Sequence, residues 1–185
     1  SNQFPDVTAE HATTCLIAEQ FLSQPIQQLV GDHACYINFP YSLILNGLAD
    51  SLPIEQVVIE ILEDAEPDER LLESVKRLKQ KGYRLALDDF TLDPRWEVFL
   101  PYIDVIKFDF RLTSHEDIAA YIAQHKNSHV TYLAEKVETQ QEFIAAQKMG
   151  FSLFQGYFFS RPEIVQQKTL SDSQITVMQL LKEVN

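Results

Sequence analysis

Short, almost wholly apolar runs recur along this chain and predict the strands of a sheet. The segment 57–62 is the clearest of them, because it is rich in Val and Ile and is polar only at Glu60. Near-continuous apolar runs of this kind are typical of parallel sheets that are buried on both faces. The pattern predicts six strands, at Ala34–Ile37, Val57–Leu62, Arg84–Leu87, Asp104–Phe108, Val130–Ala134 and Leu153–Phe158.

Helical periodicity and capping residues fill the segments between these runs. Pro67 suits the first turn of a helix that ends before Gly82, and Asp93-Pro94 has the form of an N-cap followed by proline. Ser114 and Thr139 start further helices in the manner of a capping box. The pattern predicts helices at 8–24, 41–48, 67–81, 139–150 and 171–185, with shorter ones opening at 93 and 114.

The predicted strands begin near positions 34, 57, 84, 104, 130 and 153, so a strand recurs every 20 to 27 residues with a helix between. This alternation is the signature of an α/β fold. No glycine-rich phosphate loop follows a strand, which weighs against the nucleotide-binding open sheets. Regular spacing and polar strand ends favour a TIM-type (β/α)8 barrel. With about six βα repeats and the early strands missing, we expect the barrel to be incomplete.

The composition of the chain argues against some classes of binding partner. The chain has 185 residues and a net charge of -12, which argues against binding to a nucleic acid polymer or to an anionic membrane. No apolar run is long enough to span a bilayer. Cys15 and Cys35 show neither metal-ligand spacing nor a disulfide framework, so we expect a reduced, cytoplasmic setting.

Polar side chains mark the C-terminal end of every predicted strand. Because these ends converge on one face of a parallel barrel, their oxygens are plausible ligands for Mg²⁺ or Mn²⁺. Two such ions about 3.5–4 Å apart would suit in-line attack on a phosphodiester. The residues are Asn38, Glu60, Asp88 with Asp89, Lys107 with Asp109, Glu135 with Glu138, and Gln155.

Simpler roles remain open for the main members of this set. Asp88 or Asp89 would be an ordinary N-cap for the next helix. Glu60 stands between two isoleucines and needs a metal, a cation or a proton, because an unpaired buried carboxylate is costly. Lys107 has the same problem, and an ion pair between the two would solve both without any metal.

Six motifs in order carry a resemblance that covers nearly the whole chain. They are NFP at 38–40, EILE at 60–63, LALDDF at 85–90, IKFD at 106–109, AEKVET at 134–139 and QGYFFSRP at 155–162. Together they resemble the EAL domain, whose members hydrolyse or sense the bacterial second messenger cyclic di-GMP on a (β/α)8 barrel. The forms EILED, DDF without glycines, AEKVET and FQGYFFSRPE are similar to the branch in which an HDOD domain follows the EAL part.

The resemblance implies roles for individual residues. Asn38, Glu60 and Asp88 would be ligands of Mg²⁺ or Mn²⁺, with Asp89 near a second ion. Lys107 would orient the attacking water and Glu135 would be the general base. In supporting roles, Glu138 and Gln155 would assist the metals and the substrate, and Glu63 would brace the loop after Asp89.

Three departures from the family pattern argue against turnover. The glutamate of the EAL signature and the arginine that follows it have no counterpart here. The glycine-rich loop after the Asp pair is replaced by 91–96, TLDPRW, which is stiffer and bulkier. Lys136 stands where active members have a glycine after the base, and its ammonium is expected to lower the basicity of Glu135. Losing a positioned base typically costs about 10²–10⁴-fold in rate.

We therefore predict a degenerate, non-catalytic EAL domain that acts as a regulatory or interaction module in bacterial signalling. An active cyclic di-GMP phosphodiesterase and an inactive cyclic di-GMP receptor are the alternatives. Residues 1–170 are expected to form the truncated barrel domain, and 171–185 a C-terminal helix or the start of a linker to an HDOD domain. Exposed barrel edges should pair with another copy, or be covered by the helix at 8–24.

Overall fold

A computed structural model describes residue 31 and residues 33–159 of the chain. Within them, six strands form one parallel sheet in sequential order from β1 to β6. The strands are β1 (Cys35–Phe39), β2 (Val57–Ile61), β3 (Arg84–Leu87), β4 (Val105–Asp109), β5 (Thr131–Glu135) and β6 (Leu153–Phe154). The connections contain α3 (Tyr41–Leu45), α4 (Glu69–Gln80), α5 (His115–Gln124), α6 (Gln140–Met149) and the 3-10 helices η2 (Leu48–Ser51) and η3 (Pro94–Tyr102).

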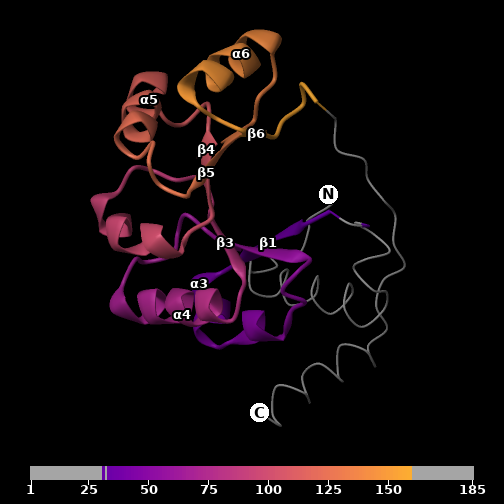
Figure 1. Ribbon diagram of the computed structural model, residues 1–185, viewed down its shortest axis with the longest axis vertical. Helices are drawn as coiled ribbons and strands as arrows, with labels where there is room; N and C mark the ends of the chain where they lie inside the picture. The colour runs from indigo at the N-terminus through magenta and orange to yellow at the C-terminus, as the bar shows by residue number, and fades with distance from the viewer. Residues whose placement is uncertain (1–30, 32, 160–185) are drawn as a thin grey trace, which may run out of the picture.

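The alternation of strand and helix confirms the α/β prediction. Figure 1 shows α4, α5 and α6 on the same side of the sheet, as expected of successive βα units in a barrel wall. Among the described residues the sheet is open, because β1 and β6 each pair with only one neighbouring strand. This arrangement agrees with the expected incomplete barrel.

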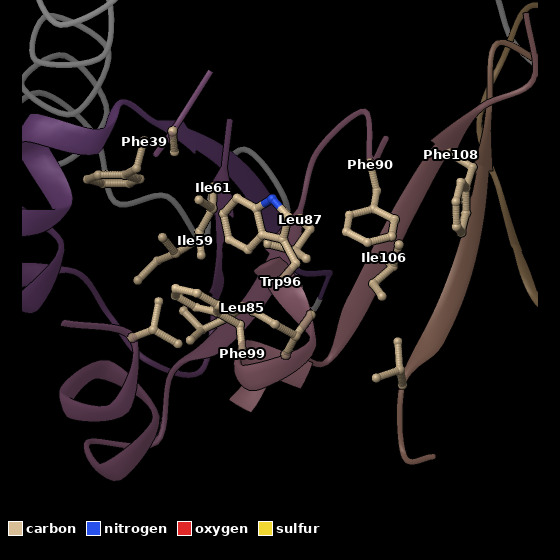
Figure 2. Packing of buried hydrophobic residues seen from close by; sticks show 14 of the residues in the cluster. Phe39, Ile59, Ile61, Leu85, Leu87, Phe90, Trp96, Phe99, Ile106 and Phe108 are labelled. Carbon is tan, nitrogen blue, oxygen red and sulfur yellow. The ribbon is translucent and has the colours of Figure 1, made fainter. Parts of the chain in front are cut away.

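The main core lies between the sheet and these helices. Alternate residues of the strands point toward the helices and are buried there, including Ile59 and Ile61 of β2. Trp96 and Phe99 of η3 pack into the same core with their ring centroids 4.8 Å apart (Figure 2). Because these residues face the helices, the intervening residues of each strand must point to the opposite face of the sheet.

The opposite face of the sheet carries a second, smaller apolar cluster. It comes from the intervening strand positions, one from each of β2 to β5, and we call it the apolar layer. Its members are Val58, Ala86, Val105 and Leu133, with the half-buried Ala34 beside them. Because strand side chains alternate, the next residues on this face lie two positions further along each strand, toward the C-terminal ends.

Helix ends follow local capping rules. Thr139 and Glu142 form the predicted capping box of α6. The prediction for Pro67 is wrong: α4 begins later, because the Asp68 carboxylate accepts a hydrogen bond from Leu71 N at 2.8 Å and caps the helix. Gly82, with a φ of 97°, ends α4 as predicted.

Three further predicted elements differ in ways that bear on the site, while other strand limits shift by a single residue. The sixth strand is only two residues long, because the chain turns at Gly156, where a side chain would collide with the backbone of Val137. The predicted helix 41–48 is divided into α3 and η2. The first strand runs on to Phe39, so Asn38 lies within β1 instead of ending it. Predictions for 8–24, 171–185 and Cys15 fall outside the described residues.

Candidate functional site

Four strands bring ionisable side chains together directly above the apolar layer. Glu60 of β2, Lys107 of β4 and Glu135 of β5 are buried there, and Asp88 follows the last residue of β3. Each stands two residues beyond a member of the apolar layer on the same strand or its extension. We call these four residues the charged layer. Side-chain alternation gives them a common face, although the strands are staggered, since Glu60 is paired with Ala86 and Lys107 with Leu133.

The backbone ladder continues past β3 and fixes the Asp pair. Asp88 N donates to Ile61 O at 2.9 Å, and Phe90 N donates to Lys107 O at 2.9 Å. Asp89 lies between these anchored residues with a φ of 37°, in the left-handed region. The next helix, η3, is capped by Asp93, so neither Asp88 nor Asp89 serves as its N-cap.

Lys107 is the centre of the charged layer. Its ammonium lies 2.6 Å from Glu60 Oε1, 2.6 Å from Asp88 Oδ1 and 2.9 Å from Glu135 Oε1. The ion pair between Glu60 and Lys107, one of the alternatives open at the sequence level, is therefore present. Lys107 thus pairs with carboxylates from three other segments, and its contact with Asp88 is a hydrogen bond.

Burial and mutual repulsion set the ionisation of this layer. Burial raises the pKa of Glu135 to about 7; Lys107 opposes the rise, and Asp88 and Asp89 add to it. Burial likewise raises the pKa of Glu60, again against the effect of Lys107. For Lys107 itself burial acts to lower the pKa, but the surrounding carboxylates outweigh it and raise the pKa. The layer thus contains a permanent cation among carboxylates that resist full ionisation.

Three carboxylates at the mouth of the layer fit a divalent cation. One oxygen each of Asp88, Asp89 and Glu135 lies within 4.8 Å of the others. Asp89 Oδ1 is buried and has no hydrogen-bond partner, which is costly unless a ligand satisfies it. An all-oxygen donor set suits Mg²⁺ or Mn²⁺. These three residues would hold such an ion.

Lys136, which was not part of the predicted set, extends the cluster through its contact with Asp109. The Lys136 ammonium donates a short hydrogen bond to Asp109 Oδ2 and lies 3.6 Å from Asp89 Oδ2. Asp109 is buried, and its other oxygen accepts from Arg111 N at 2.8 Å. Lys136 does interact electrostatically with Glu135, but burial is the largest influence on that carboxyl and its pKa is raised.

The loop after Asp89 is held by an exposed ionic clamp. Asp93 caps η3 and pairs with Arg95 at 2.7 Å, and Arg95 reaches Glu66 at 2.5 Å. Glu66 therefore provides an ionic contact to this loop. Glu63 is exposed and lies along a small pocket together with Asp88 and neighbouring loop residues.

The remaining predicted residues lie at the rim. Asn38 is exposed in β1, in register with Glu60, and Gln155 is exposed after β6. Glu138 is exposed and forms an ion pair with Arg111. The structure thus brings together six of the predicted residues, Asp109 among them, and leaves four at the periphery. Asp109 lies two residues after Lys107 on the same strand face, as its place in the predicted set implies.

Comparison with known proteins identifies a family and a relative that are similar to this chain in sequence. A sequence model of the EAL domain matches residues 38–162. The protein named cyclic di-GMP phosphodiesterase CdgJ, from Vibrio cholerae, is 42% identical over 186 residues, which is 99% of this chain and 43% of CdgJ. The chain therefore spans less than half the length of this relative.

Solved structures agree on the fold. YkuI of Bacillus subtilis, a protein with an EAL domain in complex with cyclic di-GMP and calcium, superposes with a TM-score of 0.68 at 15% identity, covering 98% of this chain and 51% of YkuI. BlrP1 of Klebsiella pneumoniae, in a complex with manganese and cyclic di-GMP, gives a TM-score of 0.65 at 26% identity, covering 84% and 46%. At 15% identity the likeness to YkuI concerns the fold alone.

None of the helices among the described residues has both the length and the apolar character needed to cross a membrane. The matched region 38–162 contains the end of β1, the whole of β2 to β6 and every residue of the charged layer. The family match, the fold and the position of the site at the carboxyl ends of the strands agree with one another. This chain belongs to the EAL domain family, and it is related to cyclic di-GMP phosphodiesterases.

Proposed function

We propose that this chain is a degenerate, non-catalytic EAL domain that acts as a regulatory or interaction module in bacterial signal transduction. The observation that carries the proposal is that two ammonium groups of the protein already contact the acidic groups of the site. Lys107 bonds to Glu60, Asp88 and Glu135, and Lys136 bonds to Asp109. Carboxylates that already contact the protein's own ammonium groups have less to gain from binding metal ions and a phosphodiester.

The position of Glu135 adds support. A general base must reach the proton that it removes with a free lone pair. In this site Glu135 Oε1 accepts from Lys107 Nζ at 2.9 Å, and the residue is buried. The ion-paired, proline-containing loop at 91–96 also leaves little freedom for the Asp pair to rearrange around substrate.

An active Mg²⁺- or Mn²⁺-dependent phosphodiesterase is the second candidate. It is favoured by the convergence of Glu60, Asp88, Lys107 and Glu135, and by the phosphodiesterase activity for which the relative CdgJ is named. A divalent ion bound at such a site would polarise a phosphoryl oxygen.

Under this second candidate, each protein group has a definite task. Lys107 would orient water, and Glu135 would accept its proton. The metal ligands would be Asn38, Glu60, Asp88 and Asp89, while Glu138, Gln155 and Glu63 would support the substrate and the loop.

One experiment separates these functions. Cyclic di-GMP and Mn²⁺ are added to the full chain, calorimetry measures binding, and chromatography detects the linear dinucleotide. We expect no product above the rate of the Glu135→Ala variant. Product that disappears in Glu135→Ala but persists in Glu116→Ala, a control on the exposed side of α5, would establish the phosphodiesterase instead. Tight binding without product would establish a cyclic di-GMP receptor.

We further propose that residues 1–170 form the EAL-like domain and that 171–185 lead toward a following HDOD domain. The support is the length of CdgJ, of which this chain covers 43%, together with the motif forms described above. Sequencing the gene downstream of residue 185 tests this directly. Association of two copies through the sheet edges is tested by sedimentation, in which a concentration-independent monomer would contradict it.

A further inference from the structure

We propose that Lys136 acts as a built-in cation in place of a second metal ion, so that the acidic site of this chain takes one divalent cation and not two. The inference rests on the metal site considered above. It concerns a residue whose contacts were not foreseen from the sequence. Sites that cleave phosphodiesters with two ions hold them about 3.5–4 Å apart, so the carboxylates between the ions must be free to bind both.

The geometry around Asp89 is the first argument. Asp89 belongs to the group of three carboxylates that fits a divalent ion, and its Oδ2 also lies 3.6 Å from the Lys136 ammonium. The same ammonium bonds to Asp109 Oδ2. A second divalent ion that used Asp89 and Asp109 would have to displace Lys136 from both carboxylates.

The backbone at Lys136 is the second argument. Its φ is 56°, in the left-handed region that glycine adopts with little strain and other residues rarely adopt. Among the described residues, Asp89 and Leu92 are the other non-glycine positions with positive φ. The strained backbone delivers the Lys136 side chain to a buried carboxylate, Asp109, that would otherwise lack a cation.

The net charge of the site is the third argument. With every group ionised, five carboxylates (Glu60, Asp88, Asp89, Asp109 and Glu135) face two ammonium groups, which leaves three negative charges. One divalent cation reduces this to a single negative charge, whereas a second would make the cluster positive. Removing Lys136 adds one negative charge, and two divalent cations would then neutralise the cluster.

The test is a titration of the full chain with Mn²⁺ alone, followed by calorimetry and by electron paramagnetic resonance. We expect the wild type to bind one ion with the spectrum of an isolated Mn²⁺. Lys136→Met and Lys136→Gly should bind a second ion at least about tenfold more tightly than any second ion in the wild type. Their spectra should show the broadening of two coupled ions. Lys136→Gly also relieves the positive φ, so at least one of the two variants should fold normally.

Two further variants make the result specific to this ammonium. Lys136→Arg keeps the charge and should restore a stoichiometry of one. Arg111→Met removes the same charge from the nearby rim, where Arg111 pairs with Glu138 outside the cluster, and should also leave one ion. Circular dichroism of each variant checks the fold.

Each outcome bears on a different claim. Two coupled Mn²⁺ ions in the wild type would overturn the inference, as would a single ion in both folded Lys136 variants. If neither the wild type nor any variant binds Mn²⁺, the metal site fails altogether and the inference fails with it. A second ion gained equally by Arg111→Met would show that bulk charge, and not Lys136, sets the number.

Discussion

Two layers of the same sheet face differ completely in chemistry although they are two residues apart on each strand. Val58, Ala86, Val105 and Leu133 form the apolar layer, and the next residues on that face are Glu60, Asp88, Lys107 and Glu135. The strands and the direction of the side chains are shared. The difference therefore lies entirely in which residue types the sequence places at each level.

The comparison separates stability from function within one structural unit. Removing apolar side chains from water stabilises the fold by about 25 cal/mol per Å². Burying charges opposes folding unless each is paired. The apolar layer and the helix-facing core thus stabilise the sheet, which then holds a charged layer that would not assemble alone. The following changes test this division, in order of decreasing effect.

The largest loss of stability is expected from the Lys107→Met variant. This change leaves Glu60, Asp88 and Glu135 close together without their common cation. Breaking a buried ion pair by removing one partner costs about 3–5 kcal/mol, so we expect a loss of that size in urea unfolding. The control is Lys79→Met, which removes the more exposed pair with Asp104 and should cost about 1 kcal/mol or less. Equal losses in the two variants would contradict the central role of Lys107.

The second-largest loss of stability is expected from the Leu133→Ala variant. It removes apolar volume from the layer below without touching a charged group, and a buried Leu→Ala change costs about 2 kcal/mol or more. Urea unfolding measures the loss. Calorimetry with Mn²⁺ should give the same stoichiometry and affinity as the wild type, since the charged layer is unchanged. A large loss of Mn²⁺ affinity would mean that the two layers are not independent.

The change of stability with pH should be smaller than the losses caused by these two substitutions. Folding raises the pKa of Glu135 from an ordinary 4.5 to about 7, so the folded state binds more protons between these values. This stabilisation is present below pH 4.5 and is lost as the pH rises through 7. With Lys107 close by to compensate part of the charge, the loss should be on the order of 1–2 kcal/mol. Urea unfolding at pH 5 and pH 8 should show a smaller decline in Glu135→Gln; an unchanged decline would exclude Glu135 as its source.

The smallest effect is expected from Arg95→Met. Arg95 bonds to Glu66 and Asp93, as Lys107 bonds to its carboxylates, but all the groups of this clamp are at least partly exposed to solvent. Exposed ion pairs contribute about 0–1 kcal/mol. In a chain of this size the melting temperature should fall by less than about 4 °C. A larger fall in a differential scanning experiment would show that the loop clamp is structurally essential.

The sequence determined the architecture to a large extent, for a local reason. Apolar runs, capping boxes and terminal glycines act over a few residues, so the six strands and most of the helices could be located from the order of the residues alone. The boundaries changed where a nonlocal contact intervened. The sixth strand ends early because Gly156 lies against the backbone of Val137, a contact between segments that no local pattern encodes.

The candidate site was predictable as a set of residues and not as a set of contacts. Because the carboxyl ends of parallel strands lie at one edge, Glu60, Asp88, Asp89, Lys107 and Glu135 were correctly expected to lie together. Their pairing depends on side-chain direction and distance across separate strands. Glu138 is the instructive case, since it follows the same strand as Glu135 yet its carboxylate is paired with Arg111 outside the cluster.

The sequence by itself therefore determined the fold class, the family and the collection of acids around one lysine, because these follow from periodicity and from residue type. Only the tertiary structure decided which charges meet. Lys136 was expected to act on its neighbour Glu135, yet it reaches across 27 positions to Asp109 because its positive φ turns the chain there. Electrostatic energy depends on distance in space, and distance in space is set by the packed sheet rather than by order along the chain.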